Sequence, residues 1–396
     1  MRLTRERPDP WVMLVVGVVG QIAGTVAASA PTFLIPYLHL QEGLPLARAG
    51  ALASAPLIGT MLTLVLWGVV VDRFGERLAM SAGLAVAAVA VLASATTDGY
   101  VALGLWWVLL GVGAASTNSA SGRLVVGWFG PERRGTAMGI RQTALPLGVG
   151  LSAVIVPPLA AGPGLVTALL VVGTVAAVAT VLSALLVVDP PRPDRQVART
   201  DGLLDNPYRR RQGLWRIHAA SALLVVPQYT VWTFMLVWLI DTRGWAPVAA
   251  GALVFSAQLL GAAGRIAAGW WTDRAGSRLR PMRLVAVGAV VVMVLLGALE
   301  STSLAVTVIL VASVVTVVDN GMAFTAVAEI GGPFWSGRAM GMQNTGQYLA
   351  AAAVPPGVGA IIAGPGYAWA FALVAVFPLL AVPLVPVRAE RPVADR

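Results

Sequence analysis

The sequence predicts an all-α membrane protein with twelve transmembrane helices in two pseudo-symmetric six-helix bundles. Of its 396 residues, 58% are hydrophobic and only 11% are charged. The mean hydropathy of +0.80 lies outside the usual range of soluble domains. A bilayer core of roughly 30 Å requires about 20 mostly apolar residues per helix, and runs of this length follow one another along the chain.

Charged or Gly/Pro-rich segments divide the apolar runs into six spans, a polar middle segment and six more spans. The predicted spans are 11–36, 46–71, 78–95, 100–129, 136–159, 165–188, 214–240, 248–271, 281–299, 303–330, 338–362 and 367–387. We therefore predict an N-terminal six-helix bundle at 1–188, a middle loop at 189–213 and a C-terminal six-helix bundle at 214–396.

The Arg residues predict the orientation of these spans. They gather at both ends of the chain, in the middle segment, and after the second, fourth and eighth spans, whereas the intervening loops hold only Arg48 and Arg243. Cytoplasmic loops carry the excess of Lys and Arg, so we expect both termini and the middle loop in the cytoplasm. All 27 basic residues are Arg, which favours a bacterial source and hence the bacterial inner membrane.

The composition also argues against several classes of protein. The net charge of +9 does not indicate nucleic-acid binding, because the basic residues are spread among the loops. There is no Cys, and the two His residues, His39 and His218, lie far apart in the sequence. No nucleophile, metal cluster or acid–base pair stands out. We therefore predict no enzyme, metal or cofactor, and we expect a monomer in the lipid bilayer.

The two halves of the sequence repeat each other. The stretch GVVVDRFG begins at Gly68 and GWWTDRAG begins at Gly269, a shift of 201 positions (269 − 68). The repeated positions are Gly68, Asp72, Arg73, Gly75 and Arg77 in the first half and Gly269, Asp273, Arg274, Gly276 and Arg278 in the second. Such internal repeats are typical of secondary transporters, whose substrate site lies near mid-membrane between the halves.

Twelve spans in two repeated halves, with G-x-x-x-D-R-x-G-x-R after the second span of each half, resemble the major facilitator superfamily. The resemblance covers the whole chain and implies transport by alternating access. It also implies that the ten repeated motif residues form cytoplasmic gates, in which the Asp pairs with Arg. Small residues such as Gly68 permit close helix contacts, and Gly75 permits a tight turn. The alternative is that both motifs only enforce the topology.

Polar side chains within the spans are the candidates for substrate binding, because such residues are costly in the bilayer and mark pathways. The candidates are Arg141, Gln142, Arg265, Gln343, Asn344, Gln21, Gln228, Tyr229 and Trp232. The planar fork of Arg suits a carboxylate or similar oxyanion. We expect Arg141 and Arg265, one from each half, to bind a small anion. The alternative is that either Arg pairs with Asp319 for a structural purpose.

Asp319 is the first candidate for proton coupling, because a carboxylate removed from water takes up a proton more readily. Glu329 is the second candidate, although its place near the cytoplasmic end of its span fits a gate or a helix-end partner equally well. His218 stands near the start of the seventh span, and we expect it at the membrane interface.

These features predict the proton-coupled uptake of a small organic or inorganic anion. The alternative is a proton-coupled efflux antiporter for drug-like or metabolite substrates. Trp107 occupies the place of an Arg that many drug exchangers of the family carry, and TALPLGVG lacks their Gly-Pro pair. Both departures count against multidrug efflux.

Overall fold

The computed structural model describes residues 8–210 and 213–390, and within these ranges every regular element is helical. Twelve helical segments of this part are long and apolar enough to cross a membrane, which confirms the predicted number of spans. These segments are Pro10–Leu40, Arg48–Phe74, Glu76–Ser94, Tyr100–Trp128, Arg134–Ala161, Leu165–Leu186, Gly213–Asp241, Ala249–Arg274, Leu279–Ala298, Leu304–Gly331, Ser336–Ala363 and Tyr367–Leu384.

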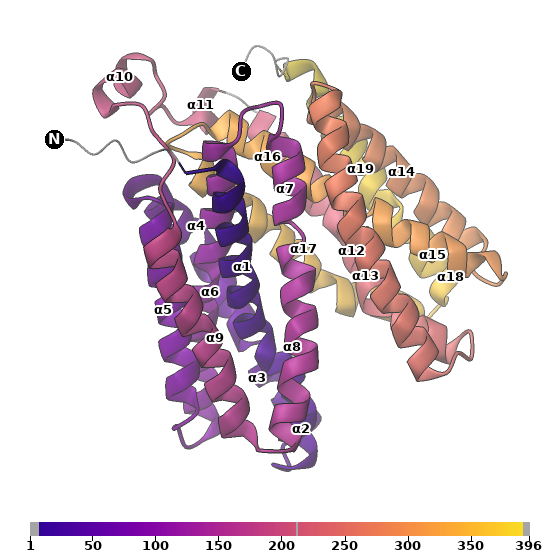
Figure 1. Cartoon of the computed structure of the whole chain (residues 1–396). Helices are drawn as coiled ribbons and strands as arrows, with labels where there is room; N and C mark the ends of the chain where they lie inside the picture. Colours follow the sequence, from indigo (N-terminus) through magenta and orange to yellow (C-terminus); the bar gives the residue numbers. More distant parts are fainter. Residues whose placement is uncertain (1–7, 211–212, 391–396) are drawn as a thin grey trace. The chain divides into compact units, whose positions relative to one another are not determined.

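Several of these segments are built from more than one helix (Figure 1). The first part of the chain forms α1 (Pro10–Phe33), α2 (Ile35–Leu40), α3 (Leu46–Ala53), α4 (Ala55–Phe74), α5 (Glu76–Ser94), α6 (Tyr100–Trp128), α7 (Arg134–Arg141), α8 (Ala144–Ala161), α9 (Leu165–Leu186), α10 (Arg195–Thr200) and α11 (Pro207–Arg210). The remainder forms α12 (Gly213–Asp241), α13 (Pro247–Arg274), α14 (Leu279–Ala298), α15 (Leu304–Val315), α16 (Asp319–Gly331), α17 (Ser336–Ala363), α18 (Tyr367–Val374), α19 (Val376–Leu384) and the 3₁₀ turn Val387–Ala389.

The helices group into two compact units. Unit 1 comprises Met1–Phe129, Thr143–Asp205 and Gly331–Gly341, and unit 2 comprises Gly130–Gln142, Asn206–Ile330 and Met342–Arg396. Each unit therefore contains a short segment from the opposite half of the sequence. These groupings do not follow the boundaries at 188 and 213, so the division of the chain at those residues stays a prediction.

In unit 1, glycines allow α6 to approach α4 and α5 closely. A Cβ atom at Gly111 of α6 would lie 1.8 Å from the carbonyl oxygen of Pro56 on α4. A Cβ atom at Gly113, on the neighbouring face, would lie 2.5 Å from the carbonyl oxygen of Gly83 on α5. Small residues drive helix packing in membranes because they let backbones come close enough for van der Waals contact. Trp107 lies in the same core with its ring fully buried.

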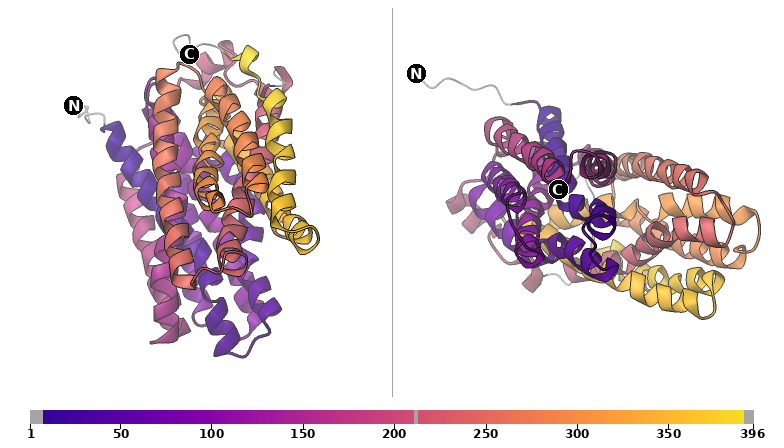
Figure 2. Two further views of the ribbon diagram at one scale, coloured as in Figure 1. Left: turned by 90° about the vertical axis from the view of Figure 1, so that its right-hand side faces the viewer. Right: turned by 90° about the horizontal axis from the view of Figure 1, so that it is seen from below.

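In unit 2, aromatic and aliphatic side chains of α12, α14, α15 and α18 fill the core. Figure 2 shows the orange and yellow helices of this unit from two further directions. Trp238 of α12 packs edge-on against Phe371 of α18, with ring centroids 6.2 Å apart. Its indole N–H donates to Glu300 at 2.8 Å, so the polar edge of the ring is satisfied.

Five of the twelve spans are interrupted, which the hydropathy pattern does not predict. Four interruptions have a local cause: Pro36, Pro56, Pro146 and Pro378 lie in the first turn of α2, α4, α8 and α19, where a missing N–H is tolerated. The break at residues 316–318, between α15 and α16, has no proline within it. Backbone groups freed by a break inside a bilayer must find other partners, so this break requires side chains that bind it.

The close crossing of α4 and α6 leads to a stability prediction. Replacing Gly111 with Val should force the two helices apart, and overpacking of this kind costs about 1–3 kcal/mol. Thermal unfolding in detergent, followed by Trp fluorescence, measures the loss. Gly150→Val is the control, because a Cβ atom at Gly150 meets nothing within 4 Å. Equal unfolding temperatures for the two variants would contradict the tight packing at Gly111.

Candidate functional site

In unit 1, the motif carboxylate of Asp72 binds the beginning of α17. It accepts hydrogen bonds from the backbone N–H groups of Gly337 at 2.9 Å and Arg338 at 3.0 Å, and from Nε of Arg338 at 2.9 Å. The first N–H groups of a helix have no partner within the helix and carry a partial positive charge. Asp72 therefore acts as a cap for a helix that lies far along the sequence.

In unit 2, the repeat-related Asp273 does the same for α7. Its carboxylate accepts from the backbone N–H groups of Gly135 at 2.9 Å and Thr136 at 2.7 Å, and from the Thr136 hydroxyl at 2.7 Å. The guanidinium of Arg278 lies 2.6 Å from the same carboxylate. Gly135 and Gly337 are themselves 202 positions apart (337 − 135), so both partners of this contact are repeated.

The motif glycines explain how the helices come so close. A Cβ atom at Gly68 would lie 2.4 Å from the carbonyl oxygen of Gly337, and one at Gly269 would lie 2.1 Å from that of Gly135. Gly68 precedes Asp72 by four residues, so both lie on one face of α4. The spacing G-x-x-x-D therefore combines a close backbone contact with a carboxylate that reaches the helix start.

The Arg residues that pair with the motif carboxylates are not the ones adjacent to them. Arg338 pairs with Asp72, and Arg278 pairs with Asp273. Arg73 and Arg274, predicted to share the gate, are exposed. Among the described contacts Arg274 stacks on the ring of Trp270, 3.9 Å from its centroid. A gating role for the motif residues stays a prediction.

The glycines that follow each motif Asp adopt backbone angles that favour glycine. Gly75 has a φ of 98° and Gly276 a φ of 58°, as expected for the tight turns predicted at these positions. After each turn a carboxylate caps the next helix: Asp189 accepts from the Arg77 N–H at 2.7 Å, and Glu390 accepts from the Arg278 N–H at 2.6 Å. Asp189 and Glu390 were not selected from the sequence, although they too are 201 positions apart (390 − 189).

Further ion pairs lie beside both motifs. In unit 1, the fully buried Glu76 is 3.3 Å from Arg123 and 3.1 Å from Arg192. In unit 2, Glu329 is 3.6 Å from Arg134 and 3.3 Å from Arg278. The contacts of Glu329 place it with the Asp273 motif, and a role for it in gating stays a prediction. Its involvement in proton coupling stays untested.

Hydrogen–deuterium exchange tests the two helix caps. Asp72→Asn leaves a single, uncharged acceptor oxygen, and charge-assisted hydrogen bonds contribute about 1.5–3 kcal/mol. Exchange of the Gly337 and Arg338 amides should therefore accelerate about 10- to 100-fold, measured on peptides by mass spectrometry. Asp273→Asn should act in the same way on Gly135 and Thr136. The exposed Asp98 provides the control variant, Asp98→Asn, and acceleration by this change as well would contradict specific capping.

A second group of polar residues lies within unit 2, and we call it the unit 2 polar cluster. Its members come from α7, α12, α13, α16 and α17 and from the turn after α7: Arg141, Gln142, Gln228, Tyr229, Trp232, Arg265, Asp319, Asn320, Gln343, Asn344 and Gln347. Eight of the nine predicted substrate-binding residues and the first proton-coupling candidate belong to it.

Arg265 connects two interrupted spans. From α13 it donates through Nη1 to the carbonyl oxygen of Gln142 at 3.2 Å and through Nε to that of Val317 at 3.5 Å. Gln142 lies in the turn between α7 and α8, and Val317 lies in the turn between α15 and α16. Arg265 thus satisfies backbone groups that both breaks release, and its guanidinium also lies 5.7 Å from the centroid of the Trp232 ring.

Asp319 is the first residue of α16, directly after the break. It is buried, and its Oδ2 has no hydrogen-bond partner in the described part of the chain. Arg265 is near enough to attract this carboxylate, but within the described contacts the two form no ion pair at 4.0 Å or less. The structure therefore does not contain a direct ion pair between Arg265 and Asp319 among its described contacts.

Amide side chains link the seventh, tenth and eleventh spans. Gln347 donates to Asn320 at 2.6 Å and to Ser221 at 2.8 Å, and Asn320 donates to Gln228 at 2.9 Å. Gln347 follows Gln343 by four residues, so both share one face of α17. That spacing was the signal in the sequence by which Gln347 could have been found.

Two further amides carry unused donors. Nε2 of Gln343 and Nδ2 of Asn344 are buried and have no partner among the described residues. The Gln343 oxygen accepts from Nδ1 of His218. His218 is only 8% exposed, because its ring is enclosed by aromatic and amide side chains of the same unit. Its expected position at the membrane interface stays a prediction.

Arg141, at the end of α7, donates to the side-chain oxygen of Gln142 at 2.7 Å. Its guanidinium lies 5.8 Å from the centroid of the Phe324 ring on α16, and Tyr348 of α17 is nearby. These neighbours place Arg141 within the unit 2 polar cluster. Tyr229 lies beside Trp232, with ring centroids 5.5 Å apart.

Gln21, the remaining predicted binding residue, belongs to unit 1. Its Nε2 donates to Asn118 at 3.3 Å, and its Oε1 accepts from Ser121 at 2.7 Å. Three polar residues of α1 and α6 are therefore joined by hydrogen bonds. Among the described residues no group of three or more His, Asp or Glu side chains is arranged to hold a metal ion.

Twelve membrane-crossing helices, one carboxylate–helix contact built twice, and buried charges beside helix breaks define a membrane transport protein. The sequence profile described as the Major Facilitator Superfamily matches residues 12–355. The chain therefore belongs to the major facilitator superfamily, a family of multi-pass membrane transporters and not of enzymes.

Similar proteins agree with this assignment. An uncharacterized MFS-type transporter of Mycobacterium tuberculosis (strain ATCC 25618 / H37Rv) is 47% identical over 384 residues, which are 96% of this chain and 86% of that one. The hexuronate transporter of Bacillus subtilis (strain 168) is 28% identical over 128 residues, 32% of this chain and 30% of that one. The structure of the E. coli fucose:proton symporter FucP has a TM-score of 0.75 at 14% identity, covering 97% and 100% of the two chains, and supports the fold alone.

Proposed function

We propose that this chain takes up a small organic or inorganic anion together with protons, by alternating access across the bacterial inner membrane. The observation that carries the proposal is the buried grouping of Arg141, Arg265 and Asp319 in unit 2. Charged residues inside membrane spans are costly and mark functional sites. Arg, with its planar set of donors, suits a carboxylate or a similar oxyanion.

The balance of charge in the unit 2 polar cluster favours an anionic ligand. Two guanidinium groups and one ionised carboxylate sum to +1, and protonation of Asp319 raises the sum to +2. A positive charge in a low-dielectric region attracts an anion more strongly than it would in water. Nε2 of Gln343 and Nδ2 of Asn344, which have no partner in the part of the chain that the structure describes, would supply neutral donors for further oxygen atoms of the same ligand.

The same balance provides a mechanism for coupling. Oδ2 of Asp319 has no hydrogen-bond partner among the described residues and is available to a proton. Because the bound proton removes a negative charge from the cluster, it strengthens the binding of an anion. By linkage, the anion strengthens the binding of the proton by the same factor. A cluster of this kind would therefore bind the proton and the anion together, as symport requires.

The relatives provide limited support for the class of substrate. The relative with 47% identity is described as an uncharacterized MFS-type transporter, and this description names no ligand. The Bacillus subtilis relative is described as a hexuronate transporter, and hexuronates carry a carboxylate. Its match covers a third of this chain, so the argument for an anion rests chiefly on Arg141 and Arg265.

The proposal includes an orientation. With both termini and the middle loop in the cytoplasm, the Asp72 and Asp273 motifs lie at the cytoplasmic ends of their spans. There the contacts of Asp72 with α17 and of Asp273 with α7 would form and break as the transporter changes state. Each of these charge-assisted hydrogen bonds contributes only about 1.5–3 kcal/mol, so the contacts are reversible.

Uptake into proteoliposomes tests the anion. Labelled glucuronate, gluconate and phosphate are the probes, with the exterior made acidic relative to the interior. The native protein should accumulate at least one probe, and Arg265→Ala should lower the initial rate at least tenfold, because loss of a hydrogen-bonded charge costs about 1.5–3 kcal/mol. Arg280→Ala, which alters an exposed Arg, is the control and should retain uptake.

Two outcomes would contradict the proposed function. Expulsion of a cationic dye without accumulation of any anion would favour the efflux antiporter. Normal uptake by Arg265→Ala would assign this residue to the support of the helix breaks alone. Arg265→Lys is a second variant, which keeps the charge but loses the planar fork. Its unfolding temperature, compared with that of the native protein, separates a misfolded variant from a folded but inactive one.

Asp319→Asn tests proton coupling separately. Asn resembles the protonated carboxylate, so the variant should still exchange labelled for unlabelled anion at equal concentrations on both sides. It should not accumulate anion in response to a pH gradient, because the group that binds the proton is gone. Asp98→Asn is the control. Accumulation by Asp319→Asn at the native level would exclude Asp319 as the coupling residue.

A further inference from the structure

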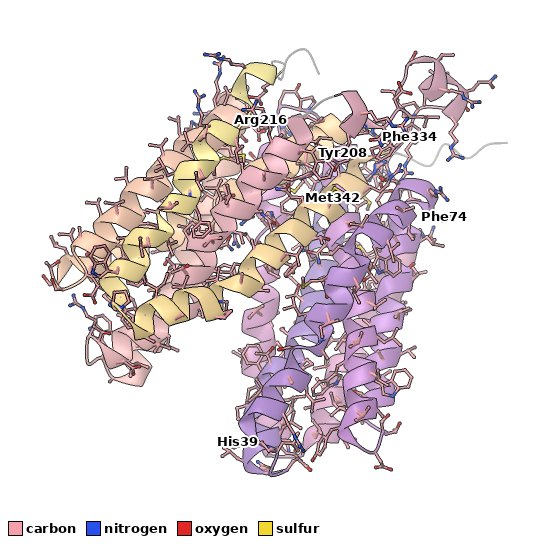
Figure 3. All side chains as sticks on the ribbon, turned by 180° about the vertical axis from the view of Figure 1, so that it is seen from behind. His39, Phe74, Tyr208, Arg216, Phe334 and Met342 are labelled. Carbon is pink, nitrogen blue, oxygen red and sulfur yellow. The ribbon has the colours of Figure 1, made fainter. Side chains whose placement is uncertain are left out.

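A hydrogen-bonded chain leads from the segment between the two halves of the sequence to the unit 2 polar cluster. The hydroxyl of Tyr208, in α11, lies 2.8 Å from Nε2 of His218 on α12. Nδ1 of His218 in turn contacts the side-chain oxygen of Gln343 on α17. Figure 3 labels Tyr208 and Met342, the residue before Gln343, at the same end of unit 2. Three helices thus contribute one residue each.

The chemistry of these groups determines where the protons lie. The oxygen of Gln343 can only accept, so Nδ1 of His218 must carry a proton and donate it. In a neutral imidazole Nε2 is then the acceptor, and the Tyr208 hydroxyl must donate to it. With the Gln343 oxygen facing Nδ1, as in this structure, only this tautomer of a neutral His218 satisfies both neighbours.

Aromatic packing holds the His218 ring in this orientation. Tyr208 stacks on it with a centroid distance of 5.8 Å, and Trp215 lies edge-on at 6.0 Å. No carboxylate or guanidinium is among the described contacts of the ring. Among its described contacts the ring is therefore held by neutral partners.

The contact with His218 fixes the orientation of the Gln343 amide. Since its oxygen faces His218, its nitrogen must face the opposite way. That nitrogen is buried and has no partner among the described residues, and Gln343 is only 1% exposed. A buried donor without an acceptor is unfavourable, and an oxygen atom of a bound ligand would satisfy it.

We propose that Tyr208 and His218 are positioning residues that hold the Gln343 amide with its N–H groups toward the substrate, so that this point of the site selects a ligand oxygen. The proposal rests on the proposed function, because it takes the ligand to be the transported anion. Without the two positioning residues the amide would flip freely and present its oxygen, which repels an anionic oxygen, for part of the time.

The protonation of His218 can be measured without a substrate. The chain holds only two His residues, so ¹⁵N-histidine labelling of the protein in lipid nanodiscs yields two imidazoles, and His39→Asn assigns them. We expect His218 to carry its proton on Nδ1. Tyr208→Phe should move the Nε2 resonance toward that of a free imine nitrogen. A proton on Nε2 in the native protein, or an Nε2 resonance unchanged by Tyr208→Phe, would overturn the chain.

Transport of labelled glucuronate then tests the effect on the ligand. His218→Phe removes the donor to Gln343 and should raise KM about fivefold with kcat unchanged, as for the loss of one neutral hydrogen bond. His218→Asn supplies an amide donor near the position of Nδ1 and should restore KM to within about twofold. An unchanged KM for His218→Phe, or a loss of kcat alone, would refute the positioning role. If the native protein carries no glucuronate, the proposed function fails for this probe, whereas the NMR measurement still decides the orientation of the chain.

Discussion

The structure depends on a carboxylate that binds the start of a distant helix, and this contact is built twice. Asp72 caps α17 in unit 1, and Asp273 caps α7 in unit 2. The first turn of a helix offers several unpaired N–H groups and a partial positive charge of about half an elementary charge. A single side chain thereby joins segments that are far apart in the sequence, and the resulting units each include a segment of the opposite half.

This contact is possible only because the backbones approach closely. Glycine stands at Gly68 and Gly337 in one unit and at Gly269 and Gly135 in the other, and a Cβ atom at any of them would overlap a neighbouring backbone. Larger residues would hold the carboxylate out of reach of the helix start. The repeated motif is therefore required for packing as well as for electrostatics. If the motif only enforced the membrane topology, glycine would not be needed at Gly68 and Gly269.

The unit 2 polar cluster follows from a different constraint, the need to satisfy backbone groups at helix breaks inside a membrane. Arg265 binds carbonyl oxygens at two breaks, and this places a positive charge beside Asp319. Structural support and ligand attraction are thus combined in one side chain. The amides of Gln228, Asn320 and Gln347 form hydrogen bonds with one another, whereas the side-chain nitrogens of Gln343 and Asn344 have no partner within residues 8–210 and 213–390.

Hydropathy and the internal repeat alone determined the twelve spans, the family, and the positions of Gly68, Asp72 and their repeats, because these are properties of composition and of spacing along the chain. The repeat offset also relates Asp189 to Glu390, but both lie outside the apolar runs, where the sequence pattern predicts topology and not hydrogen-bond partners. The tertiary structure alone decided that Arg338 and Arg278 are the partners of the motif carboxylates, that span ten breaks before Asp319, and that His218 is buried against Gln343. Hydrogen-bond partners are set by which helices meet, and no proline or glycine in the sequence marks the break at residues 316–318.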